Sequence, residues 1–186
     1  MIDLVLRNRS YRRYDENSRL SEDYLRKLVN LARLCPSSRN QQALKFILIS
    51  SREKCDMLFP SLAWAGYIKG WDGPAEGERP PAYIIILGDN ELGKSFSTDL
   101  GIAAQTILLG AAEDGFGGCM IASVKREKVR ADFNIPDIYD ILLVLAVGKP
   151  VETVVIEDMK GGDIKYWRDE LGVHHVPKRG LNEIIV

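Results

Sequence analysis

Cysteine and histidine are scarce in this sequence of 186 residues, which holds three cysteines and two histidines. Cys35, Cys55 and Cys119 lie far apart and include no C-x-x-C pair, so no disulfide framework is indicated and a reducing compartment is expected. His174 and His175 are adjacent, and adjacent side chains of an extended chain point to opposite sides. Because that arrangement suits chelation poorly, we predict no metal site.

An excess of charge and a long hydrophobic run are also missing. The formal net charge is −1, with 25 basic and 26 acidic side chains, so no basic field is available to attract nucleic acid or a membrane surface. The most apolar stretch, residues 100–112, is too short to span a bilayer and contains Gln105. Asp3 and Arg7 interrupt any early apolar run, so no signal peptide is expected. We predict a cytoplasmic protein with no nucleic-acid or membrane partner.

Helical and extended apolar patterns alternate along the chain, whose length fits a single domain over residues 1–186. Short apolar runs predict buried strands at residues 45–50, 82–88, 118–123 and 140–148. Helices are predicted at residues 2–8, 21–34, 52–71 with a break at Pro60, 97–115 and 124–133. Such alternation is typical of a doubly wound α/β fold, but no strand is followed by a glycine-rich dinucleotide-binding turn.

The end of the chain, residues 149–186, is expected to be an extended tail with one turn of helix near residues 164–171. It closes on the apolar segment LNEIIV, residues 181–186. A free terminus is seldom so apolar. We therefore expect this segment to pair with a sheet edge or to wrap a partner subunit.

The stretch GDNELGKS, residues 88–95, fits the phosphate-binding pattern G-x-x-x-x-G-K-[ST], between a predicted strand and a predicted helix. Asp89 and Glu91 would bring negative charge against a triphosphate, and no hydrophobic run ends in an aspartate suited to magnesium. We favour the interpretation of a solvated connector. A P-loop nucleotide kinase or NTPase using residues 88–95 remains the rival hypothesis.

The N-terminal part of the chain carries two motifs in a fixed order. The first comprises Arg9, Ser10, Arg12 and Tyr14, and the second comprises Pro36, Ser37, Ser38, Asn40, Gln42 and Phe46. In order, spacing and residue type they resemble the signature of the nitroreductase family of FMN enzymes. The apolar helix with its following strand, and the basic C-terminal segment HHVPKRGLNEIIV, resemble the family as well, so the resemblance runs from about Val5 to Val186.

This resemblance implies an α+β fold with a mainly antiparallel central sheet flanked by helices. It also implies a homodimer in which the C-terminal tail of each subunit extends onto the other. FMN would be reduced by NADH or NADPH and would then reduce a nitroaromatic, a quinone or a similar small-molecule acceptor in a ping-pong mechanism. No residue is predicted to be catalytic, because the flavin N5 carries the chemistry. A non-catalytic flavin-binding protein on the same fold is a second alternative.

The residues that the resemblance implies for FMN match the chemistry of its parts. Arginine and lysine suit the phosphate dianion, and short polar side chains can hydrogen-bond to the ribityl chain. The implied phosphate ligands are Arg9 and either Lys178 or Arg179. Arg12 is assigned to the flavin ring or ribityl side. Further polar contacts are implied for Ser10, Ser37, Ser38 and Asn40. The backbone of Ile121, Ala122 and Ser123 is expected to approach N5. Residues 36–40 are expected to come from the opposite subunit.

The sequence departs from the family pattern at three places. Asn8 stands where many relatives have an arginine, Arg39 stands where a small residue is usual, and Ala43-Leu44 replace a proline and a tryptophan. Arg39 could reach the active site and bind an anionic substrate. These changes leave the natural acceptor open, and no 2′-phosphate site separates NADH from NADPH.

Overall fold

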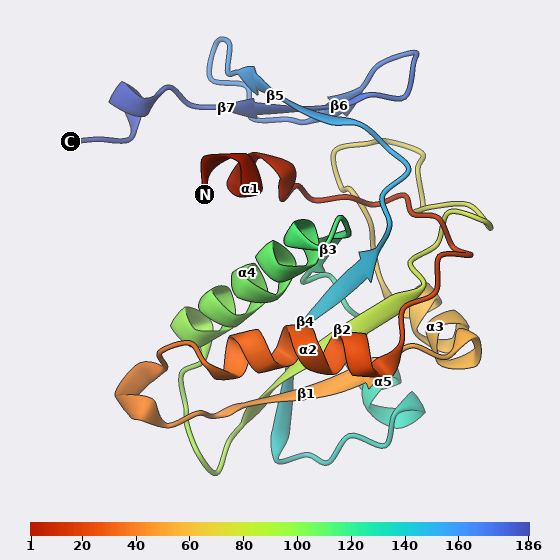
Figure 1. Ribbon diagram of the computed structural model, residues 1–186, viewed down its shortest axis with the longest axis vertical. Coiled ribbons are helices and arrows are strands. Elements are labelled where there is room, and N and C mark those ends of the chain that lie inside the picture. The colour runs from red at the N-terminus through yellow and green to blue at the C-terminus, as the bar shows by residue number, and fades with distance from the viewer.

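Four strands form an antiparallel sheet in the spatial order β1-β2-β4-β3 in the computed structural model, which describes residues 1–186 (Figure 1). The strands are β1 (Leu44–Ile49), β2 (Ala82–Asp89), β3 (Gly117–Ile121) and β4 (Tyr139–Gly148). All three pairings are antiparallel, so the predicted sheet is confirmed and a doubly wound fold is excluded. Each strand begins and ends close to the predicted position, because each coincides with one short apolar run that can be seen directly in the sequence.

Both faces of the central strand β2 are covered, and every residue of this strand is buried. Its side chains alternate between two core clusters: Tyr83, Ile85 and Leu87 belong to one, and Ile84 and Ile86 belong to the other. This alternation follows from the two-residue period of an extended strand. The sheet is therefore the middle layer of a three-layer arrangement.

The helices cover the two faces unequally. Helices α2 (Glu22–Arg33) and α4 (Ser97–Glu113) pack together on one face, as Figure 1 shows, and α3 (Arg52–Leu58) and α5 (Arg126–Asp132) lie on the other. The short helix α1 (Ile2–Arg7) contacts α4. The predicted helix over residues 52–71 is shorter than expected: α3 ends at Leu58, a 3-10 turn over Phe59–Ser61 contains Pro60, and residues 62–71 form no helix.

The tail departs most from expectation. Instead of an extended chain it forms a second, three-stranded sheet in the order β5-β7-β6, which lies apart from the main sheet on the side of α1 (Figure 1). Its strands are β5 (Val154–Asp158), β6 (Trp167–Arg168) and β7 (His174–Lys178), with β5 parallel and β6 antiparallel to β7.

The predicted turn of helix near residues 164–171 is wrong, because a hairpin occupies this segment. The Asp169 side chain accepts hydrogen bonds from the backbone N–H groups of Leu171 and Val173 at 3.0 and 2.8 Å. Trp167 stacks on His175 across the pair, with ring centroids 4.8 Å apart. A local aspartate turn and a cross-strand aromatic pair therefore stabilise the hairpin over a helical turn.

The apolar end of the chain has no partner within the protomer. Residues 181–183 form a short 3-10 turn, and Leu181, Ile184, Ile185 and Val186 are exposed. In Figure 1 this end projects away from both sheets. The expected contact with a partner subunit stays a prediction. Among the helices, none is both long and apolar enough to cross a membrane.

Candidate functional site

Two neighbouring cavities lie where the N-terminal segment meets β3 and the tail sheet. The first, here called the β3 cavity, has a volume of about 220 Å³ and is bounded by residues 63–66, residues 119–123, Arg12 and Tyr166. The second, here called the tail cavity, has a volume of about 230 Å³ and is lined by Asn8, Arg9, Ser10, Arg12, Val154, Tyr166, His174, Val176 and Lys178. Arg12 and Tyr166 line both, so the two cavities are adjacent parts of one hollow region. No acidic side chain lines either of them.

Seven of the eleven residues expected at a cofactor gather at these cavities. Arg9, Ser10, Arg12 and Lys178 line the tail cavity, and Ile121, Ala122 and Ser123 line the β3 cavity. Arg179 is not among them: its guanidinium lies 3.6 Å from Glu183 and is half exposed. Of the two basic candidates in the tail, the structure therefore places Lys178 at the cavity.

Ser37, Ser38 and Asn40 lie elsewhere in the protomer. Ser37 lines a separate cavity beside the start of α4, and the backbone N–H of Ser38 donates to the buried carboxylate of Asp99 at 2.9 Å. Arg39 and Asn40 adopt left-handed backbone conformations, with φ of 52° and 54°. This segment and the Arg12 side chain do not share a cavity within one chain.

Arg12 is the cation that both cavities share, and no carboxylate pairs with it. Its Nη1 lies 3.1 Å from the Ser10 carbonyl oxygen and 3.4 Å from His174 Nε2, and its guanidinium lies 5.0 Å from the Tyr166 ring centre. Two other arginines nearby are neutralised: Arg13 pairs with Glu78 and Arg168 pairs with Glu152. The positive charge of Arg12 is therefore left for a ligand in the cavities.

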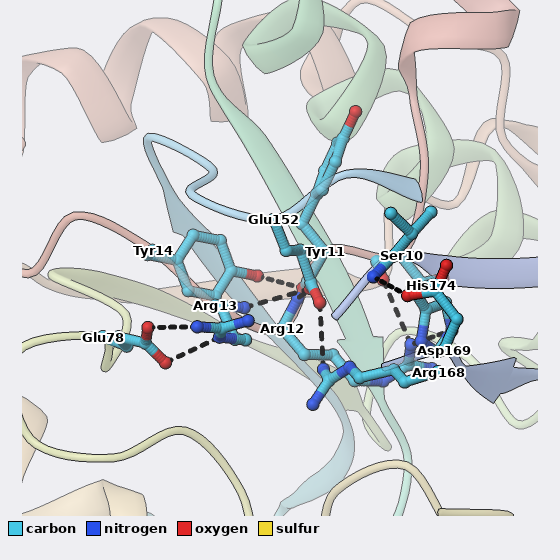
Figure 2. A network of polar contacts seen from close by, with 11 residues as sticks. Ser10, Tyr11, Arg12, Arg13, Tyr14, Glu78, Glu152, Arg168, Asp169 and His174 are labelled. Carbon is cyan, nitrogen blue, oxygen red and sulfur yellow. Dashed lines mark hydrogen bonds and ion pairs between the residues drawn. The ribbon is translucent and has the colours of Figure 1, made fainter. Parts of the chain in front are cut away.

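Glu152, just after β4, organises the arginines around this cation (Figure 2). Its side chain is almost fully buried and accepts a hydrogen bond from Arg168 Nη2 at 2.9 Å. Its other oxygen accepts from the backbone N–H groups of Arg12 and Arg13. One carboxylate thus ties the N-terminal motif to β6 of the tail sheet, and it fixes the backbone of Arg12 without touching its guanidinium.

His174 is buried beside Arg12 and is held in the uncharged state. Burial, together with the positive charges of Arg12 and Arg168, lowers the pKa of His174 to about 4. A neutral ring accepts at Nε2 from Arg12 only when its proton is on Nδ1. That Nδ1 is buried without a hydrogen-bond partner. The residue is therefore a neutral acceptor beside an unpaired cation.

His175 faces the other side of the strand, as the adjacent positions predicted. Its Nδ1 lies 2.5 Å from Glu157 on β5, and its Nε2 lies 3.2 Å from Asp169 in the hairpin turn. The hydrogen bonds with Glu157 and Asp169 raise the pKa of His175 above its ordinary value. The protonated ring can donate to both carboxylates at once and so fastens β7 to its neighbours.

These opposite shifts predict that the tail sheet is most stable in a window near neutral pH. The pKa of His175 is raised on folding. Its contribution to the free energy of unfolding is therefore complete below pH ~6.5, and it is lost as the pH rises through the pKa of His175 in the folded protein. The pKa of His174 is lowered, so its contribution is present above pH ~6.5 and is lost as the pH falls toward about 4. Hydrogen exchange of the β5 and β7 amides across this range would test the window.

The His175→Gln variant is the control for the alkaline side of this window. It should remove the loss of protection at high pH and leave the acidic loss in place. The same alkaline loss in the variant and in the natural protein would contradict the assignment to His175.

The segment of residues 88–95 does not have the geometry of a phosphate-binding loop. Gly88 lies inside the sheet, paired with Leu44 and Asp140, and a Cβ added there would lie 2.6 Å from the Phe96 ring. Lys94 Nζ donates to the Asn90 carbonyl oxygen at 2.6 Å, so its ammonium group binds the backbone of its own loop. These contacts support the interpretation of a connector between β2 and α4.

Sequence reasoning missed four residues of this region: Arg168 and His174 in the tail sheet, Tyr166 just before β6, and Glu152. A turn of helix was expected at Tyr166 and Arg168, and only a structural or surface role was expected for His174. Glu152 could not be recognised from its neighbours in the segment VET, residues 151–153, because its partners lie 16 to 140 residues away in the sequence. The aromatic and charged stretch YWRDE, unusual in a free tail, was the one available sign.

The chain is similar in sequence and fold to known proteins. The model of the Nitroreductase family matches residues 5–72 and 75–149. A Methanothermobacter thermautotrophicus protein with the provisional name NADH dehydrogenase/NAD(P)H nitroreductase is 25% identical over 166 residues, which are 86% of this chain and 82% of that protein.

Two solved structures illustrate the similarity of fold. An FMN-dependent nitroreductase from Clostridium difficile R20291 has a TM-score of 0.68 at 24% identity, covering 82% of this chain and 88% of that one. A provisionally named nitroreductase from Exiguobacterium sibiricum 255-15, solved in complex with FMN, has a TM-score of 0.68 at 22% identity, with 81% and 88% covered. With a family model that spans most of the chain and a shared fold, the protein belongs to the nitroreductase family.

Proposed function

We propose that this protein is an FMN-dependent oxidoreductase that takes electrons from NADH or NADPH and delivers them to a nitroaromatic, a quinone or a similar small acceptor in two half-reactions. The observation that carries the proposal is the guanidinium of Arg12, which lines both cavities without a carboxylate partner. A half-buried arginine without a counter-ion favours an anionic ligand. The FMN bound to the Exiguobacterium relative and the nicotinamide in the Methanothermobacter name support the cofactor and the donor.

The residues at the cavities fit FMN by charge. Arg9 and Lys178 place two positive charges in a wall that contains no carboxylate, which suits a phosphate dianion, and Arg12 adds a third positive charge on the side of the flavin ring. Ser10 in the same wall supplies a hydroxyl group. In the adjoining β3 cavity the backbone of residues 121–123 lies at the end of β3, next to Arg12.

Bound FMN would supply the two-electron chemistry between the nicotinamide and the acceptor. The chain contributes binding and electrostatics: Arg12 would stabilise negative charge on the polar edge of the ring, and Glu152 and Tyr166 hold Arg12 in place. No side chain is assigned the role of general acid or base.

A homodimer is part of the proposal. The motif of residues 36–40 and the Arg12 cavities lie apart within one protomer, and a second copy could bring this motif to the cofactor. The exposed apolar end of the tail, residues 181–186, supplies a surface for such an assembly. Light scattering on the full chain, and on a chain shortened by residues 181–186, would measure its contribution.

The absorption spectrum of the purified protein tests the proposal first. We expect the two visible bands of oxidised flavin, released as FMN on denaturation, and anaerobic bleaching of these bands by NADH or NADPH. Recovery of the bands on addition of a quinone or a nitroaromatic completes the cycle. A colourless protein that takes up no added FMN refutes the proposal, and bound FMN that no nicotinamide reduces points to the non-catalytic alternative.

The Lys94→Ala variant separates this proposal from the P-loop hypothesis. Lys94 lines neither of the two cavities and donates its hydrogen bond to the loop that carries it, so the FMN dissociation constant should change less than twofold. Isothermal titration with magnesium-ATP should show no binding to either protein. Magnesium-ATP binding that the variant loses would instead support the nucleotide enzyme.

A further inference from the structure

His174 stands out among the buried groups near the cavities because it is in direct contact with Arg12. Its Nε2 lies 3.4 Å from Arg12 Nη1. The two side chains also share an aromatic neighbour, since the Tyr166 ring lies 5.0 Å from the Arg12 guanidinium and 5.1 Å from the His174 ring. Arg12 is thus held between a carbonyl oxygen, an imidazole nitrogen and a phenol ring.

The backbone of His174 is fixed more firmly than that of most tail residues. Strand β7 is the central strand of the tail sheet, and His174 pairs with Val154 on one side and Arg168 on the other. Its N–H also donates to the Thr153 carbonyl oxygen at 2.8 Å. A side chain with this support can orient a long, flexible arginine at a low cost in conformational entropy.

The acidic side chains near Arg12 bind groups other than its guanidinium. Glu152 binds Arg168 and the backbone of the N-terminal segment, and Glu78 binds Arg13 through both oxygens at 2.5 and 2.7 Å. An aspartate or glutamate in contact with Arg12 would form a charge-assisted pair and cancel its field. The neutral imidazole provides an acceptor without that cancellation.

We propose that His174 is a positioning residue for Arg12. As the neutral tautomer with its proton on Nδ1, it accepts a hydrogen bond from Arg12 and aims the guanidinium at the two cavities while leaving its positive charge available. The consequence for bound FMN rests on the proposed function, whereas the state of the imidazole does not. The structure therefore offers two separate measurements.

The first measurement is nitrogen-15 NMR of the imidazoles. The chain has only two histidines, so the His175→Gln variant leaves His174 as the single imidazole signal. We expect a neutral ring protonated on Nδ1 at pH 7, and a higher pKa for His174 when Arg12→Met is added. A protonated ring at pH 7, a proton on Nε2, or an unchanged pKa in the double variant would overturn the proposal.

The second measurement is the midpoint potential of bound FMN in variants of His174. His174→Asp should neutralise Arg12 and weaken binding of the reduced relative to the oxidised cofactor about tenfold, the size of one hydrogen bond to a charged group. For a two-electron couple this is about 30 mV more negative. His174→Gln keeps a neutral acceptor near the Nε2 position and should stay close to the natural potential, as should His175→Gln on the opposite face.

An unchanged potential in His174→Asp, or an equal shift in His174→Gln, would overturn the proposal although FMN binds. Failure of the natural protein to bind FMN would instead refute the proposed function, and the NMR result would still decide the role of His174. The NMR measurement needs no change at position 174, so it decides the proposal even where His174→Asp fails to fold.

Discussion

Replacing Arg12 with methionine should weaken FMN binding by about tenfold to a hundredfold, the range that corresponds to loss of a hydrogen bond to a charged group. Methionine keeps much of the side-chain volume but removes the one cation that lines both cavities without a carboxylate partner. Titration of the apoprotein into FMN, followed by quenching of flavin fluorescence, would measure the dissociation constant.

Arg26→Met is the matched control for this experiment. Arg26 is an exposed arginine of α2 that pairs with Glu22 one helical turn away and lines neither cavity. Its dissociation constant for FMN should stay within about twofold of the natural value. Equal affinities for the Arg12 and Arg26 variants would remove Arg12 from the site.

Replacing Glu152 with glutamine should lower the free energy of unfolding by roughly 3 kcal/mol, which is a large effect for one atom changed. Removing one partner of a buried ion pair leaves the other charge uncompensated. Here that charge is Arg168, whose side chain is 14% exposed. In addition, the amide group could offer an N–H to the backbone donors of Arg12 and Arg13. For a chain of this length the melting temperature should fall by about 6–12 °C.

Glu22→Gln provides the comparison, because Glu22 and Arg26 form an ion pair of the same kind on the exposed surface of α2. Exposed pairs of this type contribute about 0.5 kcal/mol, so the melting temperature should change by less than about 2 °C. Thermal unfolding by circular dichroism measures both variants. Similar small losses in the two proteins would show that the Glu152 network adds little to stability.

The Glu152 variant also separates stability from function. If Glu152 fixes the Arg12 backbone, the folded variant at low temperature should bind FMN less tightly than the natural protein. An unchanged dissociation constant would restrict the role of Glu152 to folding.

The sequence predicted the parts of the fold whose signals are local. The strand of residues 82–88 was recognisable because a short apolar run suffices to mark a strand buried on both faces. The helix predicted at residues 21–34 was also recognisable, and in the structure it begins after Ser21, whose side chain accepts from the Tyr24 N–H. The antiparallel order of the sheet came from the family resemblance, since strand order is not written in any single segment.

The candidate site was predictable only in part, for the same reason. Arg9, Ser10 and Arg12 belong to one local motif, and Lys178 to a recognisable basic segment. The lack of a carboxylate partner for Arg12 was not predictable, because it depends on which acidic side chain pairs with which basic side chain in the fold. Glu152, 140 residues from Arg12 in sequence, is committed to Arg168 and the backbone.

The sequence by itself determined the four strands of the main sheet, the helix α2, and membership of a family through motifs of contiguous residues. Only the tertiary structure decided that the tail folds into its own sheet, that His174 is buried beside Arg12 while His175 lies between two carboxylates, and that Arg12 is left without a counter-ion. The physical reason is the distance along the sequence over which each kind of interaction acts. Propensity and apolar periodicity act over one or two turns of chain, whereas charge pairing and burial depend on residues that only the complete fold brings together.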